Sequence, residues 1–110
     1  MRHYLVRKLG QAKCAKRNKR KRRVVSVTID DLLALLDQQG GRCAITGIEL
    51  THCGESQSDA SIDRIDSNGE YELGNIRLVC VGVNMMRGRM GDEELGEWCI
   101  NIAKGMGLWK

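Results

Sequence analysis

Proline and phenylalanine are absent from this chain of 110 residues, and its aromatic residues are limited to two tyrosines and two tryptophans. A hydrophobic core must therefore be built from Ile, Leu, Val, Met and Cys. No apolar run approaches the roughly 18 residues that a membrane-spanning helix needs. The basic N-terminus also lacks the apolar stretch of a secretion signal. We expect one soluble, non-secreted domain with no membrane partner.

Acidic residues are missing from positions 1–23, which carry eleven Lys and Arg. The other 87 residues carry seven Lys and Arg against fourteen acidic residues, a net charge of −7. We expect residues 1–23 to form a nucleic-acid-contacting arm and residues 24–110 to form the folded domain, because such a charge split fits a polyanion at the arm. The alternative is a solvated tail. The residues expected to contact phosphates, without base selectivity, are Lys16, Arg17, Lys19, Arg20, Lys21, Arg22 and Arg23.

Two helices are predicted in the N-terminal part of the chain. Residues 4–21 are rich in good helix formers, and their thin apolar stripe predicts a helix that forms fully only on a phosphate surface. The second helix follows Thr28, which with Asp31 forms a variant of the capping box. Leucines recur behind it at helical spacing until Gly40 and Gly41 end the helix. Its leucine face is expected to lie in the core.

The loops and the last helix complete the outline. Residues 48–50 are predicted to form a short strand, and residues 51–60 an exposed polar loop. A final helix is predicted to begin at Asp92. The tail is expected to dock through Trp109. The face of this helix that is predicted to be buried consists of Leu95, Trp98, Cys99 and Ile102.

Residues 61–88 carry the polar groups of chemical interest. The pattern predicts a strand that ends near Asp63, a loop, a strand opened by Asn75 and a short helix that carries Asn84. Phosphodiester hydrolysis needs a divalent cation and a group that activates water. Oxygen ligands favour Mg²⁺ or Mn²⁺, and we expect the Asp63 carboxylate and the Asn84 amide oxygen to hold the ion. The alternative is a solvated strand end of no chemical interest, with Asp63 and Asp66 salt-bridged to Arg64 and Arg77.

The order of these groups, in SIDRID, GNIRLVC and VNMMRG, resembles the ββα-metal finger of the HNH (His-Me finger) endonucleases, especially the small phage-encoded ones. The resemblance implies an α+β fold, with the finger at about residues 61–89 between N-terminal and C-terminal helices. It also implies a metal-dependent DNA endonuclease in the cytoplasm of a bacterial host cell. By position, Asp63 and Asn84 match metal ligands, and Asn75 matches the Asn that braces the loop through backbone hydrogen bonds.

Arg64 stands where this family has its general-base His. A guanidinium stays protonated near neutral pH and cannot act as a base, but it can hold a phosphate and stabilise charge in the transition state. If the chain cleaves DNA, another group must activate water. The candidates are Asp66, His52, or hydroxide bound to the metal alone, and Asp66 is the most economical choice.

The five cysteines are irregularly spaced, which argues against a disulfide framework. Related HNH proteins often carry two CxxC pairs that bind structural zinc. Cys43 and Cys80 keep the first position of each pair, and Thr46 and Val83 stand at the second. Structural zinc is not expected, because two thiolates do not complete a tetrahedral site. Cys43 and Cys80 are instead expected to face each other in the core.

Three functions are open at this point. The first is a metal-dependent DNA endonuclease in which residues 1–23 grip the backbone and Arg64 contacts phosphate. The second is a catalytically degenerate HNH-like module that binds DNA or a host protein without cleaving DNA. The third is a small basic protein whose arm contacts RNA or an acidic protein surface. Asp63, Asn75 and Asn84 in register favour the first function, whereas the missing His and the halved CxxC pairs favour the second.

Overall fold

The computed structural model describes residues 1–17 and 25–109, and the side chains of residues 14–17 are not part of that description. An antiparallel hairpin is followed directly by a short helix, and helices precede and follow this unit. The α+β class is therefore confirmed. The elements in chain order are α1 (Arg2–Arg17), α2 (Ile29–Gln38), β1 (Ala60–Arg64), β2 (Ile76–Cys80), α3 (Val81–Arg87) and α4 (Asp92–Gly105).

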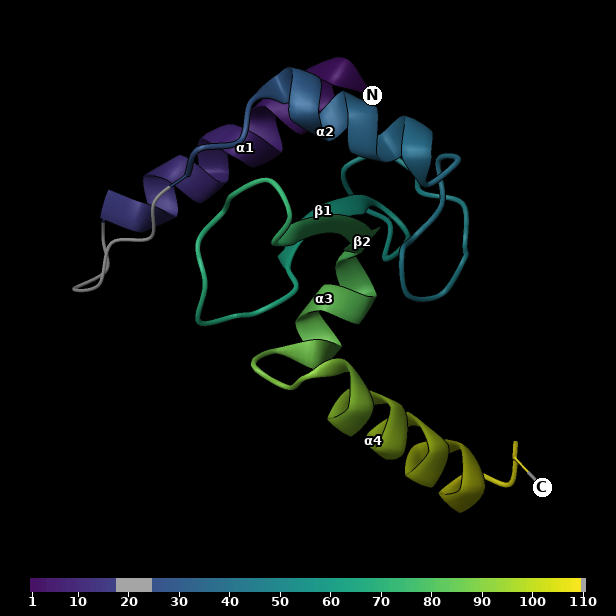
Figure 1. The fold of residues 1–110 in the computed structure, drawn as a ribbon. Coiled ribbons are helices and arrows are strands. Elements are labelled where there is room, and N and C mark those ends of the chain that lie inside the picture. The colour runs from purple at the N-terminus through teal and green to yellow at the C-terminus, as the bar shows by residue number, and fades with distance from the viewer. Residues whose placement is uncertain (18–24, 110) are drawn as a thin grey trace.

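The hairpin lies at the centre of the body, with α1 and α2 on one side and α3 on the other (Figure 1). In its register, Ala60 pairs with Cys80 and Asp63 pairs with Arg77. Because α3 begins where β2 ends, it runs back along the hairpin. Its last residue, Arg87, therefore reaches the end of β1. This return path sets the geometry of the site described below.

The core includes side chains from the basic N-terminal segment. Tyr4, Leu5 and Leu9 of α1 are buried, and the Tyr4 hydroxyl donates a hydrogen bond of 2.6 Å to the carbonyl of Ala60. Each buried side chain of this size contributes about 1.5–3 kcal/mol. The first half of residues 1–23 therefore packs as part of the body. Within the described part of the chain, no helix has the length and apolar character to cross a membrane.

The boundaries of α2 are those expected from the sequence. The Thr28 hydroxyl accepts a hydrogen bond from the backbone N–H of Asp31 at 3.2 Å, and the Asp31 carboxylate accepts one from the Thr28 N–H at 2.9 Å. The capping box is thus confirmed. Gly40 and Gly41 have positive φ values of 64° and 73°, a backbone region that favours glycine, and they end the helix.

The segment between α2 and β1 differs from the prediction in two respects. Residues 48–50 form only an isolated bridge, Arg42 to Glu49, and no strand. The loop of residues 51–60 contains one buried carboxylate, Asp59, which is 2% exposed. Its oxygens accept hydrogen bonds from the Thr51 hydroxyl at 2.6 Å and from the Gly54 N–H at 2.7 Å, so this acid organises the loop from within.

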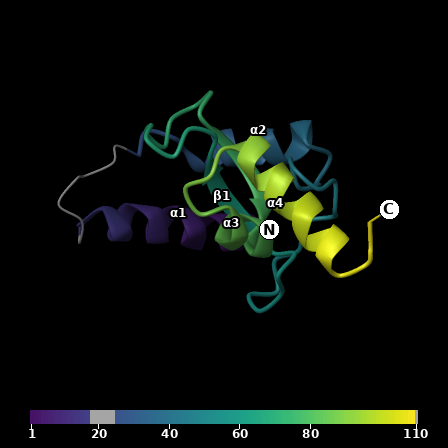
Figure 2. The same cartoon turned by 90° about the horizontal axis from the view of Figure 1, so that it is seen from below.

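Helix α4 begins at Asp92 as predicted, but its predicted buried face is wrong. Leu95 is buried, whereas Trp98 is 54% and Ile102 is 48% exposed, and Cys99 is also exposed. Trp109 is 54% exposed, so the expected docking of the tail is wrong too. The physical reason is the direction of α4, which leads away from the hairpin and the other helices (Figure 1). In the view from below, α4 lies in front of the rest of the body (Figure 2). An amphipathic pattern fixes an apolar face but supplies no surface to cover it.

Candidate functional site

Asp63 is buried near the end of β1 and both of its carboxylate oxygens are bonded to arginines. Its side chain is 2% exposed. Arg77 Nε donates to Oδ2 at 2.8 Å, and Arg87 Nη1 donates to Oδ1 at 2.5 Å. Burying a carboxylate is costly unless opposite charge and hydrogen bonds compensate it, and the two guanidiniums supply both. Of the solvated alternative, the ion pair of Asp63 with Arg77 is present, but the carboxylate is buried and its second partner is Arg87.

Arg87 joins the end of α3 to the end of β1. Its Nη1 donates to the carbonyl of Arg64 at 2.8 Å, and its Nη2 donates to the carbonyl of Ile65 at 2.6 Å. The side chain is only 3% exposed. Its Nε is buried without a hydrogen-bond partner and lies 3.7 Å from Oδ1 of Asp92. Such an unpaired buried N–H is uncommon in native proteins and calls for an explanation.

Arg77 connects the buried carboxylate to the start of α4. Its Nη1 and Nη2 donate to the two oxygens of Asp92 at 2.8 and 2.6 Å, a bidentate pair. These hydrogen bonds lower the pKa of Asp92 and raise the pKa of Arg77. We call Asp63, Arg77, Arg87 and Asp92 the arginine–aspartate cluster. Its formal charges cancel, two against two.

Arg64 points to the other side of the strand. Neighbouring residues of a strand face opposite ways, so Asp63 faces α3 and Arg64 does not. The Arg64 guanidinium lies 4.9 Å from the centre of the Tyr71 ring and donates to the carbonyl of Gly69 at 3.1 Å. The structure therefore places Arg64 at the loop between the strands, not beside the Asp63 carboxylate. Its expected contact with a phosphate stays a prediction.

Asn75 closes the loop between the strands. Its Oδ1 accepts from the N–H of Asp66 at 2.9 Å, and its Nδ2 donates to the carbonyls of Asp66 at 3.2 Å and Glu70 at 2.9 Å. A Cβ at Gly69 would lie 2.6 Å from Asn75 Nδ2, so a larger residue there would push the Asn75 amide out of its hydrogen bonds. This is the loop-bracing arrangement that the family resemblance implies. The exposed Asp66 carboxylate accepts from the N–H of Asn68 at 2.9 Å within the same turn.

Asn84 lies on the face of α3 that packs against β1, one helical turn before Arg87. Its Nδ2 donates to the hydroxyl of Ser61 at 2.7 Å. Ser61 and Asp63 share one face of β1 because side chains alternate along a strand. The structure thus brings Asn84 and Asp63 to the same face, each with a different partner.

The residues around Asp63 do not fit a divalent cation in this arrangement. A cation would need at least one of the two carboxylate oxygens that guanidiniums now occupy, and it would lie against two positive charges. In the part of the chain that the structure describes, no group of three or more His, Cys, Asp or Glu could hold a metal ion. The Mg²⁺ or Mn²⁺ site at Asp63 and Asn84 stays a prediction that requires Arg77 or Arg87 to move away.

Cys43 and Cys80 are both buried and face each other, as expected from the sequence. Cys43 Sγ accepts from the backbone N–H groups of Cys80 at 3.3 Å and Thr46 at 3.4 Å. Burial raises the pKa of the Cys43 thiol, but hydrogen bonds from Thr46 and from backbone N–H groups outweigh it and lower the pKa to about 7. Burial, with the neighbouring Cys43, raises the pKa of Cys80. The Thr46 hydroxyl lies 4.0 Å from Cys80 Sγ.

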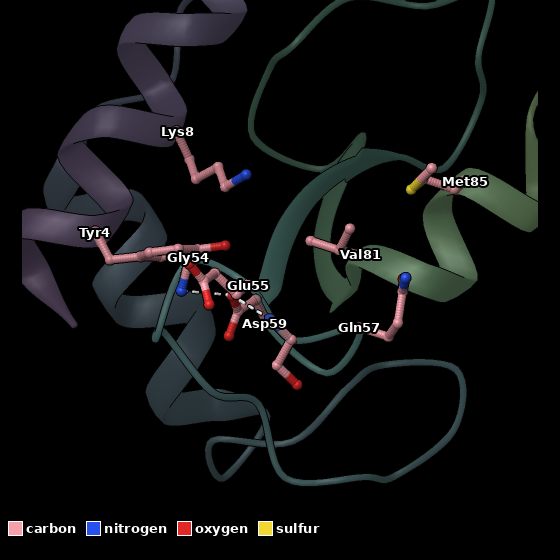
Figure 3. Close-up of a pocket in the computed structure, with 9 residues that line it drawn as sticks. Tyr4, Lys8, Gly54, Glu55, Gln57, Asp59, Val81 and Met85 are labelled. Atoms are coloured by element: carbon pink, nitrogen blue, oxygen red, sulfur yellow. Dashed lines mark hydrogen bonds between the residues drawn. The ribbon is translucent and has the colours of Figure 1, made fainter.

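A small pocket of about 160 Å³ lies between α1, the loop before β1 and α3 (Figure 3). Tyr4 and Lys8 come from α1, and Val81 and Met85 come from α3. The remaining lining residues are Gly54, Glu55, Ser56, Gln57 and Asp59. His52, the alternative base, has its ring 6.4 Å from that of Tyr4. It is therefore near the start of β1, whereas Asp63 is near its end.

The predicted phosphate contacts fall at the limit of the described chain. Lys16 and Arg17 end α1, but their side chains are outside the description. The other five contacts lie outside the described residues, namely Lys19, Arg20, Lys21, Arg22 and Arg23. On the described part of α1, Arg7 and Lys8 lie 5.9 and 5.4 Å from the centre of the Tyr4 ring.

Sequence reasoning missed three members of the arginine–aspartate cluster as functional candidates. The sequence predicts Arg77 only as a member of a solvated ion pair, and it indicates no role at the site for Arg87 or Asp92. One available signal was the spacing of Asn84 and Arg87, three apart on a predicted helix, which puts both on one helix face. Comparisons with protein-family models, curated proteins and solved structures gave no match.

Proposed function

We propose that this chain is an HNH-like module that binds the DNA backbone and, in the arrangement described above, does not hydrolyse it. One observation carries the proposal: the Asp63 carboxylate is buried and both its oxygens are bonded to arginines. The hairpin, the helix α3 and the loop brace at Asn75 support an HNH-like scaffold. The name of the scaffold rests on the resemblance in residues 61–88 together with this topology.

The lack of a poised base also supports binding over cleavage. Hydrolysis needs a group that can take a proton from water beside the metal and the phosphate. Arg64 stays protonated and lies over Tyr71. The Asp66 carboxylate is exposed and engaged in a local turn. Arg64 therefore cannot take this proton, and the Asp66 carboxylate already serves its own turn.

Backbone binding follows from the charge and from the anchoring of α1. Tyr4, Leu5 and Leu9 are buried and fix this helix to the body. The basic run therefore follows a helix that is packed on the domain. Each phosphate that is neutralised releases counterions and makes the slope of log affinity against log salt more negative by about 0.9. Contacts of this kind carry no base preference.

Metal-dependent cleavage is the second candidate function, and one observation favours it. Asp63 and Asn84 lie on the same side of β1, facing α3, as a pair of ligands from a strand and a helix would. Cleavage would require Arg77 and Arg87 to release Asp63. In that case the group that activates water would be Asp66, His52 or a metal-bound hydroxide.

Supercoiled plasmid distinguishes the two functions. Wild-type protein is incubated with plasmid and Mg²⁺ or Mn²⁺, and Asn84→Ala serves as the matched variant because it leaves the arginine–aspartate cluster intact. We expect a salt-dependent mobility shift and no nicking by either protein. Metal-dependent nicking that Asn84→Ala abolishes would establish the endonuclease instead. Arg64→His is a further variant, and nicking that appears only with His would show that the chain lacks its base.

A further inference from the structure

An exposed carboxylate covers two nearly buried guanidinium groups at the start of α4. Asp92 is 56% exposed, whereas Arg77 is 14% and Arg87 is 3% exposed. Asp92 is thus the outer member of the group. It accepts both N–H groups from one edge of Arg77, at 2.8 and 2.6 Å. Two oxygens of a phosphate accept the same fork of donors.

The unpaired Nε of Arg87 points to an anion larger than a carboxylate. This N–H is buried, has no hydrogen-bond partner and lies 3.7 Å from the nearer oxygen of Asp92. Both oxygens of Asp92 accept from Arg77, and in that orientation neither comes within hydrogen-bond distance of Arg87 Nε. A backbone phosphate is tetrahedral and wider than a carboxylate. Its two non-bridging oxygens can serve the fork of Arg77, and an ester oxygen or one of the same non-bridging oxygens can then come within reach of Arg87. An acceptor in this place would satisfy the orphaned donor.

Asp63 holds the two arginines in place on the side away from Asp92. Asp63 accepts from Arg77 Nε and from Arg87 Nη1, and these bonds do not involve Asp92. Removing the Asp92 carboxylate would therefore leave both guanidiniums in place with one uncompensated positive charge. The N-terminus of α4 adds the positive end of a helix dipole, while Glu93 and Glu94 in the same turn oppose an anion.

We propose that Arg77 and Arg87 form a binding site for a backbone phosphate of DNA, and that Asp92 occupies this site as an internal substitute. A phosphate binds by taking the position of the Asp92 carboxylate. This exchange also breaks the ion pair that ties the start of α4 to the hairpin. The inference rests on the proposed DNA-binding function and assigns the phosphate contact to Arg77 and Arg87 in place of Arg64.

The test compares Asp92→Asn with Glu94→Gln in the full-length protein. Both variants lose one negative charge in the first turn of α4, but only Asp92 contacts the arginines. Binding of a short labelled DNA duplex is followed by fluorescence anisotropy at fixed salt. We expect Asp92→Asn to bind several-fold more tightly than Glu94→Gln. Equal affinities of the two variants would overturn the proposal, because general electrostatics would then explain the gain.

Inorganic phosphate provides an arm of the test that does not depend on DNA. We expect phosphate, at matched ionic strength against chloride, to raise the melting temperature of Asp92→Asn more than that of Glu94→Gln. Equal shifts in the two variants would also overturn the site. Wild-type protein could bind no DNA while phosphate still raises the melting temperature of Asp92→Asn more than that of Glu94→Gln. In that case the DNA-binding function fails and the anion site remains.

Discussion

At the residue scale, the two oxygens of Asp63 join three separate parts of the chain. One oxygen binds Arg77 of β2, and the other binds Arg87 of α3. Arg77 then binds Asp92 at the start of α4. The Asp63 carboxylate therefore links β1 directly to β2 and α3 and, through Arg77, to the start of α4. It is a structural residue in this arrangement.

Replacing Asp63 with Asn should destabilise the fold strongly. The amide keeps the shape of the side chain but leaves two nearly buried guanidiniums with only Asp92 as a counter-charge. Removing one partner of a buried ion pair typically costs about 3–5 kcal/mol. Urea denaturation measures the loss, and Asp66→Asn, an exposed acid just past the same strand, is the control. A similar small loss in both variants would show that the cluster contributes little to stability.

Asp59 should make the stability depend on pH in the acid range. Hydrogen bonds from the Thr51 hydroxyl, and then from Cys53 and the Gly54 N–H, lower the pKa of Asp59 to about 2 against its usual value near 4. A lowered pKa in the folded state stabilises the protein above the unfolded-state pKa. This contribution is lost as the pH falls from about 4 to about 2.

Melting temperatures of wild type and Asp59→Asn between pH 6 and pH 2 would measure this effect. We expect the variant to melt lower at pH 6, with the gap narrowing as the pH falls through about 4 to about 2. A gap that stays constant would mean that the ionised form of Asp59 contributes nothing. Asp37→Asn, an exposed acid on α2, is a suitable control.

At the element scale, α1 has two different halves. The first half contributes Tyr4, Leu5 and Leu9 to the core, and the second leads into the basic run. Deleting residues 1–23 would therefore remove core side chains together with the charges. The charges have to be tested by substitution within the full chain.

Neutralising two lysines of the basic run should lower the salt dependence of DNA binding. The variant Lys19→Gln with Lys21→Gln is compared with Arg89→Gln with Lys104→Gln, which removes the same charge from exposed positions elsewhere. If each lysine neutralises a phosphate, the negative slope of log affinity against log salt becomes shallower by up to about 1.8 in the first variant. The same fall in both variants would remove the basic run from the interface.

The sequence was informative where a structure depends on neighbouring residues. The capping box of Thr28 and Asp31, the two strands and the start of α4 at Asp92 all follow from short patterns. The pairing of Asp63 with Arg87 could not be predicted this way. Arg87 is 24 residues away, and the two meet only because α3 runs back along the hairpin. Likewise, the apolar positions of α4 predict a helix face, but the direction of α4 leaves Trp98 exposed.

At the scale of the whole molecule, charge is divided between the two ends of the chain. The N-terminal helix is basic, and α4 carries four acids in Asp92–Glu97 against Lys104. The arginine–aspartate cluster lies between them and is internally neutral. This division suits a protein that meets a polyanion through one end, with Asp92 as the acid that screens the arginines of the body.

Centrally, we infer that the oxygens of the Asp63 carboxylate bind arginines and not a metal ion. Titration with Mn²⁺, followed by electron paramagnetic resonance, tests it directly in wild type and in Asn84→Ala. We predict weak, non-saturating Mn²⁺ binding that is the same in both proteins. One saturable Mn²⁺ site in wild type that Asn84→Ala abolishes would contradict the account.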